Sequence, residues 1–342
     1  MSRSLRLIFV LAIMPTLADT GFAQEEAGSA KVVAFHNYTQ AIELKRGNAK
    51  AILSPQAGGR VLEFSVDGKH AMFLDEQEKA WQPGKPAQSS AGRFDYGPEL
   101  TVIAHPTLWS GDWTGEIVGP CAAKLTSPRD EVAGIQLVRE FSLTSEATVD
   151  GKPVAPSLIC KQTILNISNK VQEVCHWGRS FSPGGGICLI PLGDRPSRFP
   201  SKYAMYEDSA IINVRNKDDL IRERDGFLEI LAPPRKPKLG FDTYAGWLGY
   251  LMPNDTLFVK RFATHSDRVY SEAAGLTLSV WYPTGPRIEL EPIGPRERLK
   301  PSESAAFTEE WFLTTHPFPK NGQQVNLKEF HSQVTGILNV KR

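Results

Sequence analysis

A pair of glutamates beside an arginine, on one predicted strand, is the clearest candidate for proton-transfer chemistry. From Arg287 to Glu291 the sequence alternates polar and apolar residues and then reaches a proline. Successive side chains of a β-strand point to opposite faces, so Arg287, Glu289 and Glu291 are expected on one face. Ile288 and Leu290 then face the core. The polar face is either solvated or one wall of a cleft. In a cleft, Glu289 would raise the pKa of Glu291 and Arg287 would oppose that rise.

A histidine followed by a tryptophan is the second feature with catalytic chemistry. His176 and Trp177 lie in the segment 175–179, far upstream of Glu291. A histidine can donate a proton near neutral pH because its unperturbed pKa lies in that range. A carboxylate can accept one when its neighbours adjust its pKa. His176 and Glu291 are therefore candidates for a general acid and a general base, although a lone histidine is also commonly a structural residue.

Three tryptophans are candidates for stacking on a ligand: Trp109, Trp113 and Trp177. An indole offers a flat apolar surface with a polar N–H group at its rim. Core packing is the alternative for each of them. The segment 109–113 carries Ser, Gly and Asp between its two tryptophans, which is typical of an exposed loop and favours ligand contact.

The sequence predicts that strands and turns, with few helices, position these residues. Short tracts alternate polar and apolar residues and end at turn-forming residues, as at 61–66 before Asp67-Gly68. Helices are expected only in the segment 218–224 and in the tail around 327–337. This pattern is typical of an all-β sandwich, which commonly reaches such a length as one domain.

The N-terminus has the features of a secretory signal peptide. Arg3 and Arg6 precede an apolar run over residues 7–17, and a small-residue cleavage site follows at 21–23. The run is too short for a stable membrane anchor, and no later stretch is long enough for a membrane helix. We therefore expect an exported protein, periplasmic or extracellular. We expect a signal peptide at residues 1–23 and a single domain at 24–342. The core of this domain is expected at about 37–315, and a C-terminal tail at 316–342.

Charge and cysteine content narrow the classes of ligand. The formal net charge is +1, and removal of Arg3, Arg6 and Asp19 with the signal peptide would bring it to about zero. A near-neutral chain without a basic stripe is a poor candidate for nucleic-acid binding, so a neutral or weakly charged small ligand is expected.

Four cysteines can form disulfides in three full pairings or remain free thiols. No CxxC spacing or His/Cys cluster indicates zinc, and neither a metal nor a cofactor is expected.

The order of several short motifs resembles the galactose mutarotase-like superfamily, which includes the aldose 1-epimerases and exported relatives. In chain order the motifs are Gly-Gly-Arg-Val at 58–61, Asp-Gly-Lys at 67–69, Asn-Ile-Ser-Asn at 166–169, His-Trp at 176–177 and Leu-Glu-Pro at 290–292. The resemblance implies a large two-sheet β-sandwich, the supersandwich of galactose mutarotases. It also implies a saccharide ligand held on the concave face of one sheet.

The resemblance assigns roles to individual residues. His176 and Glu291 match the family's acid and base, which would protonate the ring oxygen and deprotonate the anomeric hydroxyl while the ring opens and recloses. Arg93 matches an arginine that contacts the sugar, although the family's downstream Asn-Arg pair is absent here. The residues expected to line the cleft are Arg93, Asp95, Trp109, Trp113, Trp177, Arg179 and Glu289.

Three classes of function remain open on this sequence. The first is an aldose 1-epimerase-like isomerase that uses His176 and Glu291. The second is a carbohydrate-binding protein without catalysis. The third is a polysaccharide lyase or a glycoside hydrolase accessory domain, with Asp95, Tyr96 and Glu99 as the cluster for a second acid–base set. One fold hosts many activities, so the sequence decides neither the class, nor the sugar, nor the oligomeric state.

Overall fold

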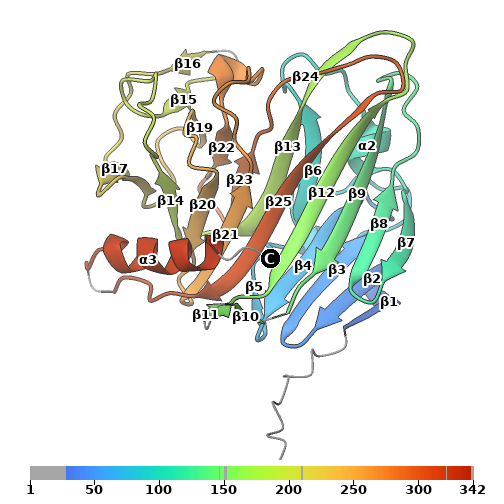
Figure 1. Cartoon of the computed structure of the whole chain (residues 1–342), viewed down its shortest axis with the longest axis horizontal. Coiled ribbons are helices and arrows are strands. Elements are labelled where there is room, and N and C mark those ends of the chain that lie inside the picture. The colour runs from blue at the N-terminus through green and yellow to red at the C-terminus, as the bar shows by residue number, and fades with distance from the viewer. Residues whose placement is uncertain (1–27, 146, 150–151, 209–210, 321, 340–342) are drawn as a thin grey trace, which may run out of the picture.

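The computed structural model describes residues 28–145, 147–149, 152–208, 211–320 and 322–339. The predicted signal peptide at 1–23 lies outside the described residues. Within them, most regular structure is β-strand, arranged in two large antiparallel sheets (Figure 1). The prediction of an all-β sandwich is confirmed.

The first sheet has thirteen strands and carries most of the predicted site residues. Eleven of them follow one another across the sheet, while β5 (Lys69–His70) pairs with β4 and β24 (Glu297–Leu299) pairs with β13. The order is β1 (Ser29–Phe35), β2 (Tyr38–Arg46), β3 (Ala49–Ser54), β4 (Arg60–Val66), β6 (Gly92–Gly97), β13 (Gln172–Pro183), β23 (Arg287–Pro292), β22 (Leu278–Trp281), β19 (Lys238–Phe241), β15 (Ala204–Tyr206) and β16 (Ile212–Asn213).

The second sheet has ten strands. Their order is β17 (Ile221–Arg224), β18 (Phe227–Ile230), β14 (Ile187–Pro191), β20 (Trp247–Leu251), β21 (Thr256–Phe262), β25 (Ser304–Thr315), β12 (Ser157–Asn166), β9 (Ile135–Leu143), β8 (Ala122–Thr126) and β7 (Thr114–Gly119). The remaining elements are a small hairpin, three α-helices and a 3₁₀ turn: β10 (Ala147–Val149) with β11 (Lys152–Val154), α1 (Glu76–Lys79), α2 (Pro106–Ser110), α3 (Leu327–Leu338) and Ala273–Gly275.

One apolar core joins the two sheets. It contains Phe94 and Leu290 from the first sheet and Trp311 from the second, and the rings of Phe94 and Trp311 stack with centroids 5.7 Å apart. An ion pair lies inside this core, because Lys260 Nζ is 2.9 Å from Glu309 Oε2 and both side chains are fully buried. The burial of apolar surface between the sheets is the main force that holds them together.

The strand with alternating charges lies inside the first sheet, between β13 and β22. Ile288 and Leu290 of β23 are fully buried in the shared core, as predicted. Glu289 and Glu291 therefore point to the other face of the sheet. That face carries the candidate site.

The two predicted helices have different outcomes. The tail forms α3, whose Phe330, Val334 and Ile337 pack on the second sheet, as the prediction for 327–337 requires. The prediction of a helix at 218–224 is wrong, because this segment ends in β17. Arg222 and Arg224 both bind the buried Glu229 of the neighbouring β18, so the charges form cross-strand pairs.

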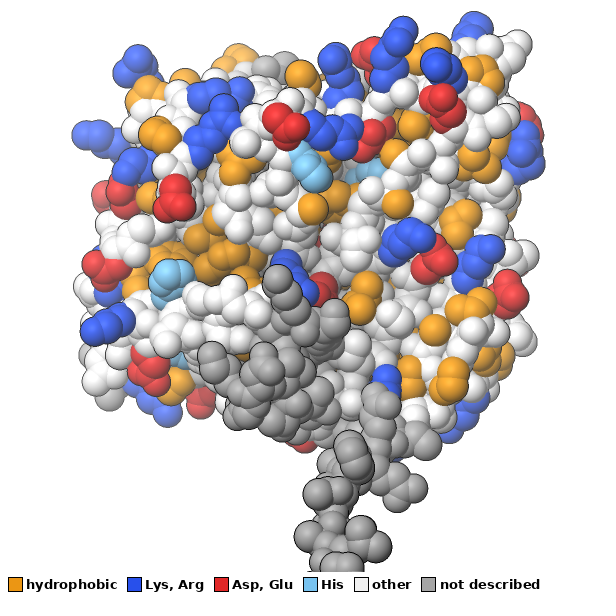
Figure 2. All heavy atoms as spheres, in the orientation of Figure 1, with side chains coloured by type: hydrophobic (Ala, Val, Ile, Leu, Met, Phe, Trp, Pro, Cys, Tyr) orange, Lys and Arg blue, Asp and Glu red, His pale blue; other side chains and the backbone are white. Residues whose placement is uncertain are grey.

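Three further findings concern the cysteines, the helices and the surface charge. All four cysteines are buried free thiols: Cys121, Cys160, Cys175 and Cys188. Among the described residues, no helix combines the length and the apolar character needed to cross a membrane. Basic and acidic side chains are interspersed over the face shown in Figure 2, in agreement with the near-neutral charge.

Candidate functional site

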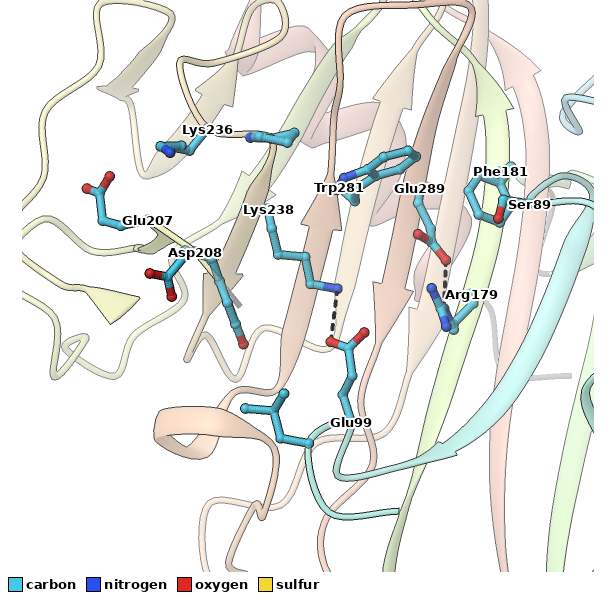
Figure 3. A pocket seen from close by; sticks show the side chains of 13 residues that line it. Ser89, Glu99, Arg179, Phe181, Glu207, Asp208, Lys236, Lys238, Trp281 and Glu289 are labelled. Atoms are coloured by element: carbon cyan, nitrogen blue, oxygen red, sulfur yellow. Dashed lines mark hydrogen bonds and ion pairs between the residues drawn. The ribbon is translucent and has the colours of Figure 1, made fainter. Parts of the chain in front are cut away.

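A pocket of about 550 Å³ lies on the face of the first sheet that points away from the shared core (Figure 3). Strands β13, β15, β19, β22 and β23 supply much of its lining, and the loop after β6 supplies Glu99 and Leu100. The lining residues are Ser89, Glu99, Leu100, Arg179, Phe181, Tyr206, Glu207, Asp208, Lys236, Pro237, Lys238, Trp281 and Glu289.

Strand register brings residues from distant parts of the chain into one row on the pocket wall. Phe181 of β13 stands opposite Glu289 of β23, Glu289 opposite Trp281 of β22, and Trp281 opposite Lys238 of β19. Directly opposed residues of antiparallel strands point to the same face of a sheet. The row therefore places an acid, an indole and a cation side by side.

Arg179 and Glu289 form an ion pair on this wall. Arg179 Nε donates to Glu289 Oε1 at 2.7 Å, and Arg179 Nη1 lies 3.7 Å from Asp95 Oδ2. Burial alone would lower the pKa of Arg179, but the carboxylates of Glu289, Glu291 and Asp95 raise it above its usual value. Arg179 therefore stays charged and keeps Glu289 in a fixed orientation.

Lys238 and Glu291 form a second ion pair, deeper in the wall. Lys238 Nζ lies 2.7 Å from Glu291 Oε2 and 3.9 Å from Glu99 Oε2. The same Glu291 oxygen accepts a hydrogen bond from Trp177 Nε1 at 2.8 Å. Glu291 Oε1 has no hydrogen-bond partner among the described residues. The pair thus holds one charge at the pocket surface and one beneath it.

The pKa values of this pair shift in the same direction for different reasons. Burial raises the pKa of Glu291 to about 7; the charge of Lys238 opposes this rise and that of Glu289 adds to it. For Lys238, burial lowers the pKa, but the charges of Glu291, Glu289 and Glu99 raise it above its usual value. Glu291 is therefore a buried carboxyl group that changes protonation near neutral pH, beside a lysine that stays charged.

The predicted tuning of Glu291 is confirmed for one neighbour and wrong for the other. Glu289 raises the pKa of Glu291, as expected from their shared strand face. The opposing cations are Lys238 and Arg179, whereas Arg287 Nη1 lies 3.7 Å from Asp75 Oδ2. Arg287 thus belongs to the rim beyond the pocket.

Comparison with known proteins places this geometry in a structural context. No family model matches the chain, and no curated protein matches it. Solved structures do match. A galactose mutarotase-like protein from Lactobacillus casei has a TM-score of 0.54 and 12% identity, over 80% of this chain and 100% of that chain. A galactose mutarotase-like protein from Clostridium acetobutylicum has a TM-score of 0.55 and 10% identity, over 85% and 99%.

A galactose mutarotase related enzyme from Lactobacillus acidophilus is similar to the same degree, with a TM-score of 0.55 and 10% identity over 83% of this chain and 100% of that chain. The chain has the galactose mutarotase-like fold. The predicted superfamily resemblance is confirmed at the level of fold.

Within this galactose mutarotase-like fold, His176 and Glu291 do not meet. His176 stands opposite Tyr96 and faces the core between the sheets, where its Nε2 bonds the Ala305 carbonyl at 3.2 Å and its ring stacks on Phe307. Burial lowers the pKa of His176 to about 4, so the imidazole is neutral near pH 7. The predicted acid and base lie on opposite faces of the first sheet, because adjacent strand residues alternate and Trp177 takes the pocket side.

The predicted tryptophans occupy three different environments. Trp177 is buried beneath the pocket and donates to Glu291. Trp109 on α2 is half-buried, with the guanidinium carbon of Arg93 3.2 Å from its ring centroid. Trp113 is a core residue, packed 4.3 Å from the guanidinium carbon of Arg139. None of the three tryptophans lines the pocket, so the expectation that they form the cleft wall is not met.

Arg93 and Asp95 lie beside the pocket and organise its loops. Arg93 Nη1 donates to the Gln88 carbonyl at 2.6 Å, and Nη2 donates to the Trp109 carbonyl at 3.0 Å. Asp95 Oδ1 lies 2.7 Å from His105 Nε2. Burial lowers the pKa of His105, but the hydrogen bond and charge of Asp95 produce a net rise.

The cluster considered for lyase or hydrolase chemistry does not converge on one site. Asp95 stands opposite Trp177 on the pocket side, whereas Tyr96 is buried in the core on the other face. Glu99 lies past the end of β6, where it borders the pocket near Lys238.

Several pocket residues were not predicted from the sequence. Lys238, Trp281 and Tyr206 all line the pocket, and each lies on a short strand with no distinctive motif. The sequence shows only a lysine or a tryptophan at the end of a short apolar strand, which is common in proteins. The strand order, which places β22, β19 and β15 in succession after β23, is what brings these residues to the pocket.

Proposed function

We propose that the protein binds a saccharide in the pocket of the first sheet. The observation that carries this proposal is the row Glu289, Trp281 and Lys238 beside Arg179, on the wall of a pocket large enough for a sugar. Small-ligand pockets commonly combine an apolar surface with a few fixed polar groups. The fold of galactose mutarotase-like proteins supports the same class of ligand.

The pocket chemistry favours a neutral or weakly charged ligand. Three basic and four acidic side chains line the pocket, so the wall offers hydrogen-bond donors and acceptors with little net charge. A guanidinium has five N–H donors and an ammonium three, which leaves several for sugar hydroxyls. Trp281 is half-buried and offers an indole surface to the C–H face of the ring.

Binding to a panel of free sugars, measured by isothermal titration calorimetry, tests this proposal. Trp281→Ala should weaken the affinity for the bound sugar by about tenfold or more, because it removes the stacking surface. Trp281→Phe is the matched control, since it keeps an aromatic ring on the same strand, and should retain most of the affinity. Unchanged affinity in Trp281→Ala would place the sugar elsewhere.

Interconversion of sugar anomers is the second candidate function, and the raised pKa of Glu291 favours it. A general base works best when its pKa lies near the working pH. For this chemistry Glu291, which is fully buried beneath the pocket wall, would have to reach the anomeric hydroxyl and take its proton, and Lys238 would donate a proton to the ring oxygen. The two groups would have to separate around the sugar. His176 faces the core and takes no part. Polarimetry on freshly dissolved anomers, with Glu291→Gln as the comparison, tests this step.

The predicted signal peptide extends the proposal to location. Export would bring the pocket into contact with saccharides of the periplasm or the cell exterior. Cell fractionation of the full chain, compared with a chain that lacks residues 1–23, tests this expectation. Retention of the full chain in the cytoplasm would contradict it.

A further inference from the structure

A second pocket, of about 450 Å³, lies between α2 and the loop that follows α1. Its walls contain Trp81, Pro83 and Pro86 from the loop, and Pro106 and Thr107 from α2. None of these residues belongs to the predicted site or to the pocket between Arg179 and Lys238. The second pocket therefore has no role in the function proposed above.

One stretch of chain lines both pockets, and helix α2, which lines the second, contacts a residue that lines the first. The segment 81–89 lines the second pocket at Trp81 and the first pocket at its last residue, Ser89. Helix α2 lines the second pocket, and its Trp109 ring lies 4.9 Å from the guanidinium carbon of Arg179, which lines the first. The ridge between the pockets therefore contains Gln88 and Trp109.

Arg93 holds this ridge together. One of its terminal nitrogens donates to the Gln88 carbonyl on one side, and the other donates to the Trp109 carbonyl on the other side. Its side chain is almost fully buried beneath them. A single guanidinium thus ties the segment that borders both pockets to helix α2, which lines the second.

Hydrogen bonds hold both walls of the second pocket in place. Trp81 Nε1 donates to the Lys85 carbonyl at 2.8 Å, which closes the turn that carries Pro83 and Pro86. On the other wall, Gly58 N donates to the Gly111 carbonyl at 2.8 Å and anchors the end of α2. Proline restricts the backbone, and a preformed site loses less conformational entropy on binding.

The chemistry of the second pocket suits a sugar unit. The rings of Pro83, Pro86 and Pro106 supply apolar surface beside the buried Trp81, while Thr107, Lys85 and Asp112 supply donors and acceptors. Within the described part of the chain, these three side chains make no hydrogen bond or ion pair with another residue. Exposed polar groups of both kinds beside apolar rings are what a polyol with C–H faces requires.

We propose that the two pockets are successive subsites for an oligosaccharide, whose chain crosses the ridge of Gln88 and Trp109. This inference rests on the proposed saccharide binding in the first pocket and adds the substrate class. The preferred ligand is a chain of several sugar units, because a free monosaccharide fills only one subsite. Each additional unit that is bound adds affinity without a second loss of translational freedom.

Affinity as a function of chain length tests the inference. The probes are glucose with cello- and malto-oligosaccharides, galactose with galacto-oligosaccharides, and galacturonate with oligogalacturonides, titrated by calorimetry. The matching oligosaccharide should bind about tenfold or more tightly than its monosaccharide. Equal affinity for both lengths would overturn the inference and leave the proposed function intact. Failure of every probe to bind would contradict both.

Variants separate the two subsites. The exposed pair Thr107→Ala with Asp112→Ala should remove most of the gain from chain length and leave monosaccharide affinity unchanged. Trp281→Ala should weaken both ligands. Thermal unfolding checks that the double variant is folded. An unchanged chain-length effect in a folded double variant would overturn the assignment of the second pocket as a subsite.

Discussion

Lys238 and Glu291 lie 2.7 Å apart although 53 residues separate them in the sequence. They are on β19 and β23, with β22 between them. Ser279 stands opposite Glu291, and Gly240 stands opposite Ser279, so the row between the two charges holds only small residues. The lysine therefore reaches diagonally across a neighbouring strand. The position of these two charges on the pocket wall therefore depends on the order of β19, β22 and β23 in the sheet.

Replacement of Lys238 by methionine should destabilise the fold. The change leaves the buried Glu291 without its cation, and breaking a buried pair from one side costs about 3 kcal/mol of unfolding free energy. Urea denaturation near pH 8 measures it. Lys236→Met is the matched control, because Lys236 borders the same pocket and makes no ion pair with another described residue. Its effect should stay within about 0.5 kcal/mol. Equal stability of the two variants would contradict the pair.

The stability of the fold should depend on pH through Glu291. Its pKa is raised in the folded state from 4.5 to about 7. Between these values the folded protein keeps a proton that the unfolded chain loses. The contribution of Glu291 is therefore complete below pH 4.5 and is lost as the pH rises to about 7, on the order of 3 kcal/mol in total.

Comparison with Glu291→Gln isolates this contribution. As the pH rises through this range, the unfolding free energy of the wild type should fall relative to that of the variant. Urea titrations at several pH values measure it. A difference that stays constant with pH would contradict a raised pKa for Glu291.

The sequence predicted correctly which residues of β23 face the core, but not which residues of β13 do so. Polar and apolar residues alternate in β23, so its two faces could be assigned from the sequence alone. Around His176 no such contrast exists, because Cys175, His176 and Trp177 are all buried. His176 faces the shared core, and its neighbours Cys175 and Trp177 pack under the pocket. Only the pairing of Trp177 with Asp95 settles which is which.

Lys238 shows a different limit of sequence analysis. Its role depends on the order β23, β22, β19 across the sheet, and this order is set by pairing between distant segments. Local alternation predicts that a strand exists and which residues share a face. It does not predict which strand lies beside which. The contribution of Lys238 to the pocket was therefore not predicted, whereas those of Glu289 and Arg179 were.

His176→Gln should lower stability without changing saccharide affinity. The imidazole bonds the Ala305 carbonyl in the core and does not reach the pocket, so its loss should cost about 1–3 kcal/mol. Thermal unfolding and calorimetric titration of the same sample measure both effects. A loss of affinity at unchanged stability would show that His176 acts on the ligand after all.

Gly178→Ala should destabilise the strand that carries Arg179. A Cβ atom at Gly178 would lie 1.9 Å from Glu309 Oε1. Glu309 has little freedom to move, since Lys260 and Trp311 both bind its other oxygen. A loss of about 1–3 kcal/mol is expected.

The matched control for this change is Gly336→Ala on the exposed side of α3, where a Cβ atom meets nothing within 4 Å. That variant should be more stable than wild type by about 0.5–1 kcal/mol, because alanine favours a helix more than glycine does. Similar effects of the two substitutions would contradict the close approach of Glu309 to β13.

The structure of a saccharide complex tests the central claim most directly. A crystal of the chain soaked with the sugar that binds best in solution should show that sugar in the pocket of the first sheet. Its hydroxyls should lie within hydrogen-bond distance of Arg179, Glu289 or Lys238, with one ring face on Trp281. A sugar bound at another surface, with this pocket filled only by water, would contradict the account.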